Sequence, residues 1–185
     1  MLTEVTQPET KPDTPTVQLA PLLEAAETIR DNALDQARSK LPLPQRSLSE
    51  EELLLRRDFV EFFKHGLAIG ASQAISANDQ RVQALYLFEE STNPDAETEE
   101  NLPVDMTVHL LVLVKSNSAA LASFIAALDR VLAQAISILP LPMLSGRTSI
   151  LNVVSITEDD VRNGRGYAAL LTSVFAPPLR IWQRH

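Results

Sequence analysis

Apolar residues recur about every 3.6 positions in three long stretches of the chain, a spacing typical of helices that bury one face. The first stretch covers residues 19–39, the second runs from Ser49 to about Ala77, and the third runs from about Asn117 to Ser137. The segments between them have a different character, with prolines, acidic residues or continuous apolar runs. The pattern therefore predicts three main helices.

The second of these helices has the most distinctive face. Its buried side is expected to consist of apolar residues at helical spacing, namely Leu55, Phe59, Phe62, Phe63, Leu67 and Ile69. Gly66 and Gly70 lie about one turn apart on the same helix. Because glycine has no Cβ, we expect another backbone to come close at these positions.

Two capping signals mark helix starts. Ser49 followed by Glu52 has the spacing of a capping box before an apolar run, and Thr157 followed by Asp160 repeats that spacing with an acidic partner. The second signal predicts a short helix, and a further helix is expected over Tyr167–Val174. Both short helices precede the end of the chain and follow the last long apolar run.

Four other runs are rich in apolar and β-branched residues, a composition typical of strands. They cover residues 82–88, 104–114, 150–156 and 179–182. The second half of the run 104–114 is continuously apolar, as expected for a strand that is covered on both faces. A helix between the second and third runs predicts a βαβ unit with a right-handed crossover. The sequence thus predicts an α/β (α+β) fold, a small mixed sheet flanked by helices.

The N-terminal part reads as an appendage. Residues 1–16 are rich in Thr, Pro and Glu, a composition that cannot bury enough apolar surface to stay ordered. The prolines of Leu41-Pro42-Leu43-Pro44 break the chain again. We therefore interpret residues 1–46 as a disordered, acidic and Pro-rich arm with a helix over 19–39, and residues 47–185 as one domain. An amphipathic helix on such an arm can dock a protein partner, although an inert tail explains it equally well.

Composition removes several classes of function. The 185 residues include no cysteine, which excludes disulfides, thiolate metal sites and cysteine nucleophiles. No apolar run approaches the ~20 residues of a membrane-spanning helix, and the N-terminus lacks the features of a secretory signal. We therefore expect a cytoplasmic protein that does not bind membranes. The formal net charge of −8 argues against nucleic acid as a partner.

The acidic charge is concentrated in one place. Residues 89–105 contain seven acidic side chains and no Lys or Arg, whereas only basic charges follow Asp160. Such an asymmetry suggests either an internal electrostatic match or a surface for a protein partner.

The order of the elements resembles the small nucleotidyltransferase fold of antibiotic and minimal nucleotidyltransferases. The resemblance covers residues 50–184 and rests on a strand ending in Leu87-Phe88, a polar loop, a strand opening with Asp105, and a terminal Leu179-Arg180-Ile181-Trp182. Members of that family carry Leu-Phe-Gly-Ser at the end of the first strand. An Asp-x-Asp follows at the start of the next strand, and a third carboxylate often comes from a later one. The resemblance implies transfer of a nucleotidyl group assisted by two magnesium ions.

The chain departs from that motif at most of its positions. Glu90-Ser91 replaces the Gly-Ser pair, Asp105 matches the first aspartate, Thr107 replaces the second, and Asn152 stands where the third carboxylate is expected. Neutral Thr and Asn side chains are weak magnesium ligands. The resemblance therefore implies a site that has lost most of its metal-binding groups.

The candidate residues follow from this comparison. They are Asp105 and Glu90 for a magnesium ion, Ser91, Thr107 and Asn152 for a ligand, and Asp105 and His109 for catalysis. Asp105, Thr107 and His109 are expected on one face of a strand, because side chains two positions apart point the same way. Each also has an ordinary interpretation, Asp105 as a solvent-facing residue at the start of a strand and His109 as a core histidine.

Three functional hypotheses remain open. The chain is a degenerate nucleotidyltransferase-like domain that acts as a binding, interaction or regulatory module without a cofactor. Alternatively, it is an active, divergent nucleotidyltransferase whose magnesium is held by Asp105 and a glutamate of residues 89–100. In the third hypothesis it is an unrelated α/β module. The missing carboxylates argue against catalysis but leave the question of enzymatic activity open.

Overall fold

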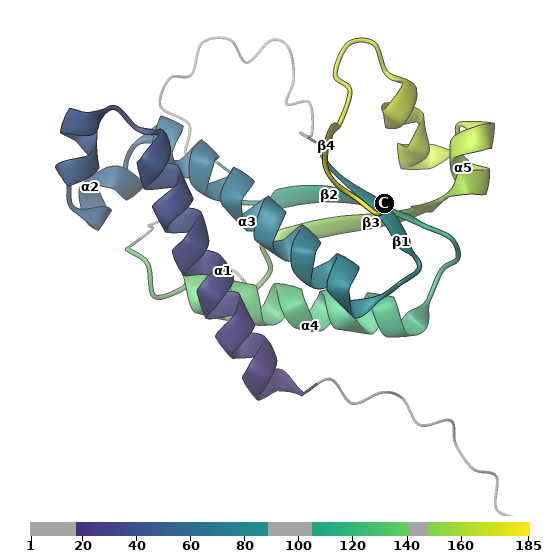
Figure 1. The fold of residues 1–185 in the computed structure, drawn as a ribbon, viewed down its shortest axis with the longest axis horizontal. Coiled ribbons are helices and arrows are strands. Elements are labelled where there is room, and N and C mark those ends of the chain that lie inside the picture. Colours follow the sequence, from purple (N-terminus) through teal and green to yellow (C-terminus); the bar gives the residue numbers. More distant parts are fainter. Residues whose placement is uncertain (1–17, 89–104, 141–147) are drawn as a thin grey trace, which may run out of the picture.

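The computed structural model describes residues 18–88, 105–140 and 148–185 (Figure 1). Within these residues four strands form one mixed sheet in the order β3-β2-β1-β4. The strands are β1 (Val82–Leu87), β2 (Val108–Val114), β3 (Leu151–Thr157) and β4 (Leu179–Gln183). β1 is antiparallel to both of its neighbours, and β2 is parallel to β3. The expected mixed sheet flanked by helices is confirmed.

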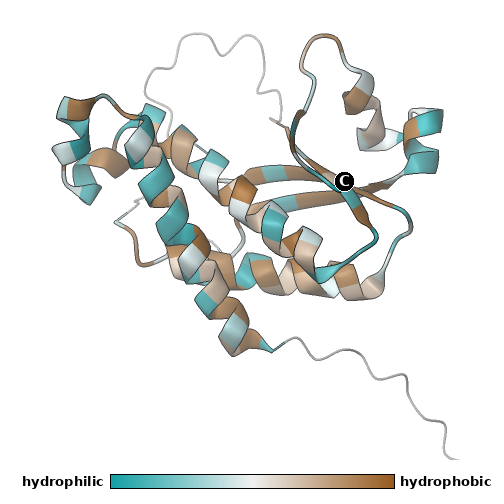
Figure 2. Cartoon of the chain, in the orientation of Figure 1, coloured by the Kyte–Doolittle hydropathy of each residue, from teal (hydrophilic) through white to brown (hydrophobic). Residues whose placement is uncertain are grey.

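Helices cover both faces of this sheet. The three long helices, α1 (Leu19–Lys40), α3 (Arg57–Asn78) and α4 (Ala119–Ile136), lie on one side, where they share the large apolar core with the strands. The short α5 (Glu158–Asn163) and the 3₁₀ helix η3 (Gly166–Thr172) lie on the other side, over a smaller cluster around Leu111. In Figure 2 hydrophobic colours dominate the strands and α4, whereas hydrophilic colours gather on α1 and α2.

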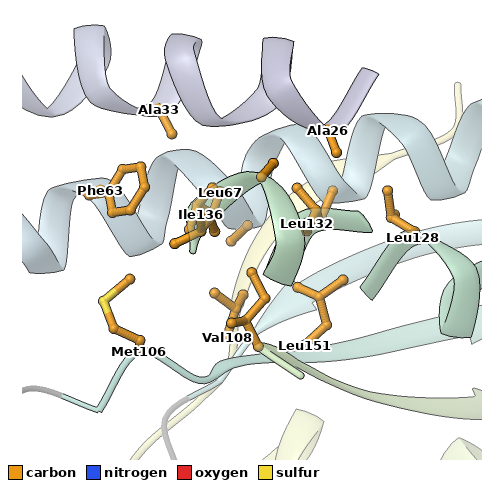
Figure 3. Packing of buried hydrophobic residues seen from close by; sticks show 14 of the residues in the cluster. Ala26, Ala33, Phe63, Leu67, Met106, Val108, Leu128, Leu132, Ile136 and Leu151 are labelled. Atoms are coloured by element: carbon orange, nitrogen blue, oxygen red, sulfur yellow. The ribbon is translucent and has the colours of Figure 1, made fainter. Parts of the chain in front are cut away.

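Helix α1 corrects the expected domain boundary. The helix forms where the sequence predicts it, but its small side chains Ala26, Ala33 and Ala37 are buried in the same core as α3 and α4. Figure 3 shows Ala26 and Ala33 pointing from α1 into the core that also contains Phe63 and Leu67 of α3. The interpretation of this helix as part of a separate appendage is therefore wrong, because its apolar stripe is needed to cover α3. Residues 1–17 lie outside the described part.

The two glycines of α3 explain why α1 packs so closely. A Cβ on Gly66 would lie 2.8 Å from the Cα of Ala33, and a Cβ on Gly70 would lie 2.6 Å from Cγ2 of Ile29. Neither distance leaves room for a methyl group without movement of α1. The expected close approach of another backbone is confirmed at Gly66, where α1 approaches with the backbone of Ala33, whereas at Gly70 the nearest atoms belong to the Ile29 side chain of α1.

The proline-containing segment after α1 is held by two arginines. The Arg38 guanidinium donates to the carbonyls of Arg46 and Leu48, and Arg46 donates to those of Leu41 and Ser39. These bonds fix η1 (Leu43–Ser47) against the end of α1. The segment that was expected to separate an arm from the domain thus connects α1 rigidly to the helices that follow.

The second predicted helix is two helices. The capping box of Ser49 and Glu52 is confirmed, but it begins only α2 (Glu50–Leu54). Arg56 then adopts an extended conformation, and its guanidinium makes two hydrogen bonds to the Asp58 carboxylate at the start of α3. Because of this break Leu55 points to solvent with 75% of its surface exposed, contrary to the expected buried face.

The remaining members of that predicted face follow the helix. Phe59, Phe63 and Leu67 are fully buried, and Phe62 and Ile69 are half-buried. Near the C-terminus the capping box of Thr157 and Asp160 is confirmed at the start of α5. The next predicted helix is a 3₁₀ helix that ends at Thr172, so it is shorter than expected.

Among the described helices, α4 alone is long and apolar enough to cross a membrane by length and composition. Its apolar side chains, including Leu128 and Leu132, are buried against the sheet and α1, and Figure 3 shows both within the core. A core helix of a globular domain passes the same test. The feature is therefore weak support for a membrane segment.

Candidate functional site

Two of the predicted site residues meet across the sheet. His109 on β2 lies in register with Asn152 on β3, and the Asn152 Nδ2 atom is 3.0 Å from the His109 Nδ1 atom. With the amide nitrogen as donor, the His109 Nδ1 atom is the acceptor. The pair is thus a hydrogen-bonded amide and imidazole, placed by the parallel pairing of two strands that are distant in sequence.

Aromatic rings border this pair on the α5 side of the sheet. The His109 ring lies 5.4 Å from the Phe88 ring, and the Phe88 ring lies 5.6 Å from the Tyr167 ring. Only 9% of the surface of His109 is exposed to solvent, whereas Tyr167 is exposed. We call His109, Asn152, Phe88 and Tyr167 the aromatic-bordered pair site. It is a small, half-covered polar spot on the sheet face that carries the apolar cluster around Leu111.

Asp105 and Thr107 do not join the strand. β2 begins at Val108, four residues later than expected, and the Asp105 Oδ1 atom accepts from the Thr107 amide at 3.1 Å and from its hydroxyl at 2.9 Å. Local bonds of this kind compete with strand pairing. The expected row of Asp105, Thr107 and His109 on one strand face is therefore wrong. The hydrogen bonds form two separate pairs, Asp105 with Thr107 and His109 with Asn152.

The rest of the predicted site falls outside the described residues. Glu90 and Ser91, and with them the acidic segment from residue 89 to 104, lie outside the residues that the structure describes. Among the residues from 18 to 88, 105 to 140 and 148 to 185, no group of three His, Asp or Glu side chains could hold a metal ion. The magnesium site stays a prediction.

The most connected charged group lies elsewhere, where α3 turns into β1. The Asp79 carboxylate accepts from the Arg81 guanidinium at 2.9 and 2.7 Å, and the same guanidinium donates to Ser118 Oγ at the start of α4. The hydrogen bonds from Arg81 hold the pKa of Asp79 below its usual range, although burial opposes the shift. This group ties three elements together, and its compact internal pairing indicates a structural role.

Sequence reasoning also missed an exposed apolar loop. The chain leaves η3 at Thr172, and Val174 and Phe175, which follow Ser173, are 84% and 96% exposed. We call these two residues the apolar tip. The Ser173 hydroxyl accepts from the Ala176 amide at 3.4 Å, and Pro177-Pro178 follow directly, so the tip is presented by a short and restricted loop. The sequence signal that could have indicated this loop is the pair of large apolar residues shortly before Pro177-Pro178, since prolines end regular structure.

Comparisons with known proteins leave the family open. No protein-family model matches the chain, and neither the curated proteins nor the solved structures contain a match. The likeness to nucleotidyltransferases therefore rests on the motifs and element order of this sequence alone.

Proposed function

We propose that the chain is a nucleotidyltransferase-like domain without metal-dependent catalysis that acts as a protein-interaction module. The observation that carries the proposal is the apolar tip, where Phe175 keeps 96% of its surface exposed. Burial of an exposed aromatic side chain in a pocket on a partner removes a large apolar surface from water and so contributes favourably to the free energy of binding. Such residues dominate the binding energy of interfaces. The apolar face of α1 is occupied in this chain's own core, so the tip replaces it as the surface for a partner.

The lack of a carboxylate in the aromatic-bordered pair site supports the absence of metal catalysis. Asn152 stands where the resemblance calls for a carboxylate, and its amide is engaged with an imidazole. Magnesium prefers hard, anionic oxygen ligands, and the pair offers no anionic oxygen. Localisation in the cytoplasm, and the absence of membrane and nucleic-acid partners, stay predictions from composition.

The interaction role is tested with the full chain in the source cells. A photo-crosslinking amino acid at Phe175 is expected to capture one defined protein, and the double substitution Val174→Ser/Phe175→Ser should abolish its co-purification. Leu55→Ser is the matched control, since Leu55 is a similarly exposed apolar residue at a different place. Loss of the partner with both variants, or with neither, contradicts the proposal.

Isothermal titration addresses the catalytic alternative. Titration of the protein with ATP or CTP in the presence of Mg²⁺ should give no binding heat. A magnesium-dependent heat that Asp105→Ala removes would overturn the proposal in favour of an active nucleotidyltransferase.

A further inference from the structure

The outer edge of β3 forms one border of the sheet. β3 pairs with β2 in an unbroken parallel register from Leu151 to Thr157. The Val108 amide donates to the Ile150 carbonyl at 2.7 Å, which fixes the phase of the ladder. Peptide groups of even-numbered β3 residues therefore face β2, and those of odd-numbered residues point away from the sheet.

The two ends of this outer edge are capped by side chains. The Leu151 amide donates to Asp129 of α4 at 2.8 Å, and the Thr157 amide donates to Asp160 of α5 at 2.9 Å. Between them lie the outward amides of Val153 and Ser155, for which no acceptor occurs in the described part of the chain. The edge thus offers two open donors, two residues apart, between two closed ends.

The sequence and the register of β3 lack the usual protections of an edge strand. Its sequence Leu-Asn-Val-Val-Ser-Ile-Thr contains no charge and no proline, and its register has no shift. The opposite edge is different, because the pairing of β4 with β1 skips Ile181 and the strand carries the exposed Arg180. A regular, uncharged edge rich in β-branched residues is a template for another strand.

We propose that this edge binds β3 of a second copy of the chain, antiparallel and about a two-fold axis at Val154. In this register Val153 faces Ser155 of the second copy, and Val154 faces Val154. The two symmetry-related pairs of Val153 with Ser155 each exchange both of their hydrogen bonds, so the four open amides of the two copies are all satisfied, and the Val154 pair between them is not hydrogen-bonded. β3 itself contains no charged side chain, although each chain has a net charge of −8, and the capping carboxylates of Asp129 and Asp160 lie at the two ends of the junction.

Self-complementarity selects a second copy over an arbitrary peptide. The open donors are symmetric about Val154, and the capped amides at Leu151 and Thr157 close the ladder at the same distance on both sides. An isologous contact requires such a self-matching surface. The result is one continuous sheet through both copies, with the apolar tips at a different place from the junction.

The first test measures the mass of the full chain in solution. Light scattering behind size exclusion should show a concentration-dependent rise from 20.4 kDa toward twice that mass. Ser155→Pro removes one open amide that has no partner among the described residues, so it should give a monomer with an unchanged circular dichroism spectrum. Ser155→Lys should act in the same direction if proline perturbs the strand, and Ser155→Thr should retain the dimer.

The register is tested by cross-linking, because the chain has no cysteine of its own. Val154→Cys should form a disulfide-linked dimer on mild oxidation, since the symmetric pair at 154 is a closely spaced, non-hydrogen-bonded pair. Ser155→Cys should not, because its counterpart lies opposite Val153. A monomer at all concentrations, a dimer unaffected by both Ser155→Pro and Ser155→Lys, or equal cross-linking at both positions overturns the proposal. A dimer that persists in Phe175→Ser separates this surface from the apolar tip.

Discussion

At Gly66 the absence of one methyl group sets how closely α1 approaches α3. The Cα of Ala33 lies where it does because no Cβ projects from the facing turn. Glycine costs about 1 kcal/mol in a helix interior relative to alanine. Here that cost is offset by the burial of the alanine stripe of α1.

Gly66→Ala should therefore lower the free energy of unfolding by about 1–2 kcal/mol, because overpacking exceeds the gain in helix propensity. Urea denaturation followed by circular dichroism measures the change. The double substitution with Ala33→Gly should recover part of it, since the two positions touch. A stabilised Gly66→Ala protein would show that α1 does not pack on α3 as described.

Asp79 provides the clearest residue-scale dependence on pH. Only 8% of its side chain is exposed to solvent, and the hydrogen bonds from Arg81 lower the pKa of its carboxyl group in the folded protein. A group whose folded pKa is depressed stabilises the fold above its unfolded pKa, and that contribution disappears as the pH falls through the folded value.

Unfolding free energy should accordingly decrease as the pH falls below about 4, the range in which a free aspartate takes up its proton. Asp79→Asn should lower stability at neutral pH by about 2 kcal/mol and remove this part of the acid dependence. Arg81→Ala should weaken the same dependence, because Arg81 causes the pKa shift. Chemical denaturation at a series of pH values measures the free energy of unfolding of each variant. A pH dependence that is the same in both variants as in the unsubstituted protein would contradict the prediction.

At the scale of elements, a single arginine fastens the C-terminal strand. Arg184 donates to the carbonyls of Val82, Ser76 and Asp79 at 2.9, 3.2 and 3.3 Å, and its guanidinium lies 5.4 Å from the centre of the Trp182 ring. β4 itself is short and mostly exposed. The attachment of this strand to α3 and β1 therefore depends strongly on the side chain that follows it.

Arg184→Ala is expected to destabilise the protein by about 2 kcal/mol and to accelerate amide exchange in β4, since three carbonyls lose a charged donor. The stability of Arg184→Lys should lie between those of the unsubstituted protein and Arg184→Ala, because lysine keeps the charge but cannot reproduce the planar guanidinium with its several donors. Arg180→Ala is the control on the same strand. Arg180 is exposed, so its loss should change stability by no more than about 0.5 kcal/mol.

At the scale of the whole molecule, the three long helices and the sheet share one core. α1 contributes Leu22, Ala26, Ala33 and Ala37 to it, and Arg30 of α1 donates to the Ala135 carbonyl in the last turn of α4 at 2.9 Å. Removing α1 would expose the apolar faces of both α3 and α4. The fold therefore needs α1 as its outer layer.

A chain that begins at Ser47 should fail to fold cooperatively. Its thermal transition by circular dichroism should be broad or absent, and it should bind the dye ANS, whereas the full chain should show a sharp transition. Addition of a peptide covering residues 18–46 should restore the transition. A fragment that unfolds cooperatively without the peptide would show that the domain is complete without α1.

The sequence by itself determined the features that depend on neighbouring residues. The capping boxes at Ser49 and Thr157 and the apolar run of β2 are local patterns, because their partners lie within a few positions. The same holds for the glycine pair of α3, which indicated a close approach without indicating by what. These local signals were sufficient for the fold class.

Tertiary structure decided every feature whose partners are far apart in the chain. The bond between His109 and Asn152 joins positions 43 residues apart, and Arg184 binds carbonyls more than 100 residues away. The predicted row of polar residues on β2 was wrong for the opposite reason, since Thr107 forms local hydrogen bonds with Asp105 before β2 begins. A pattern of apolar and polar positions records which face of an element is buried. Which distant element covers that face depends on packing, and for α1 only the assembled core resolved it.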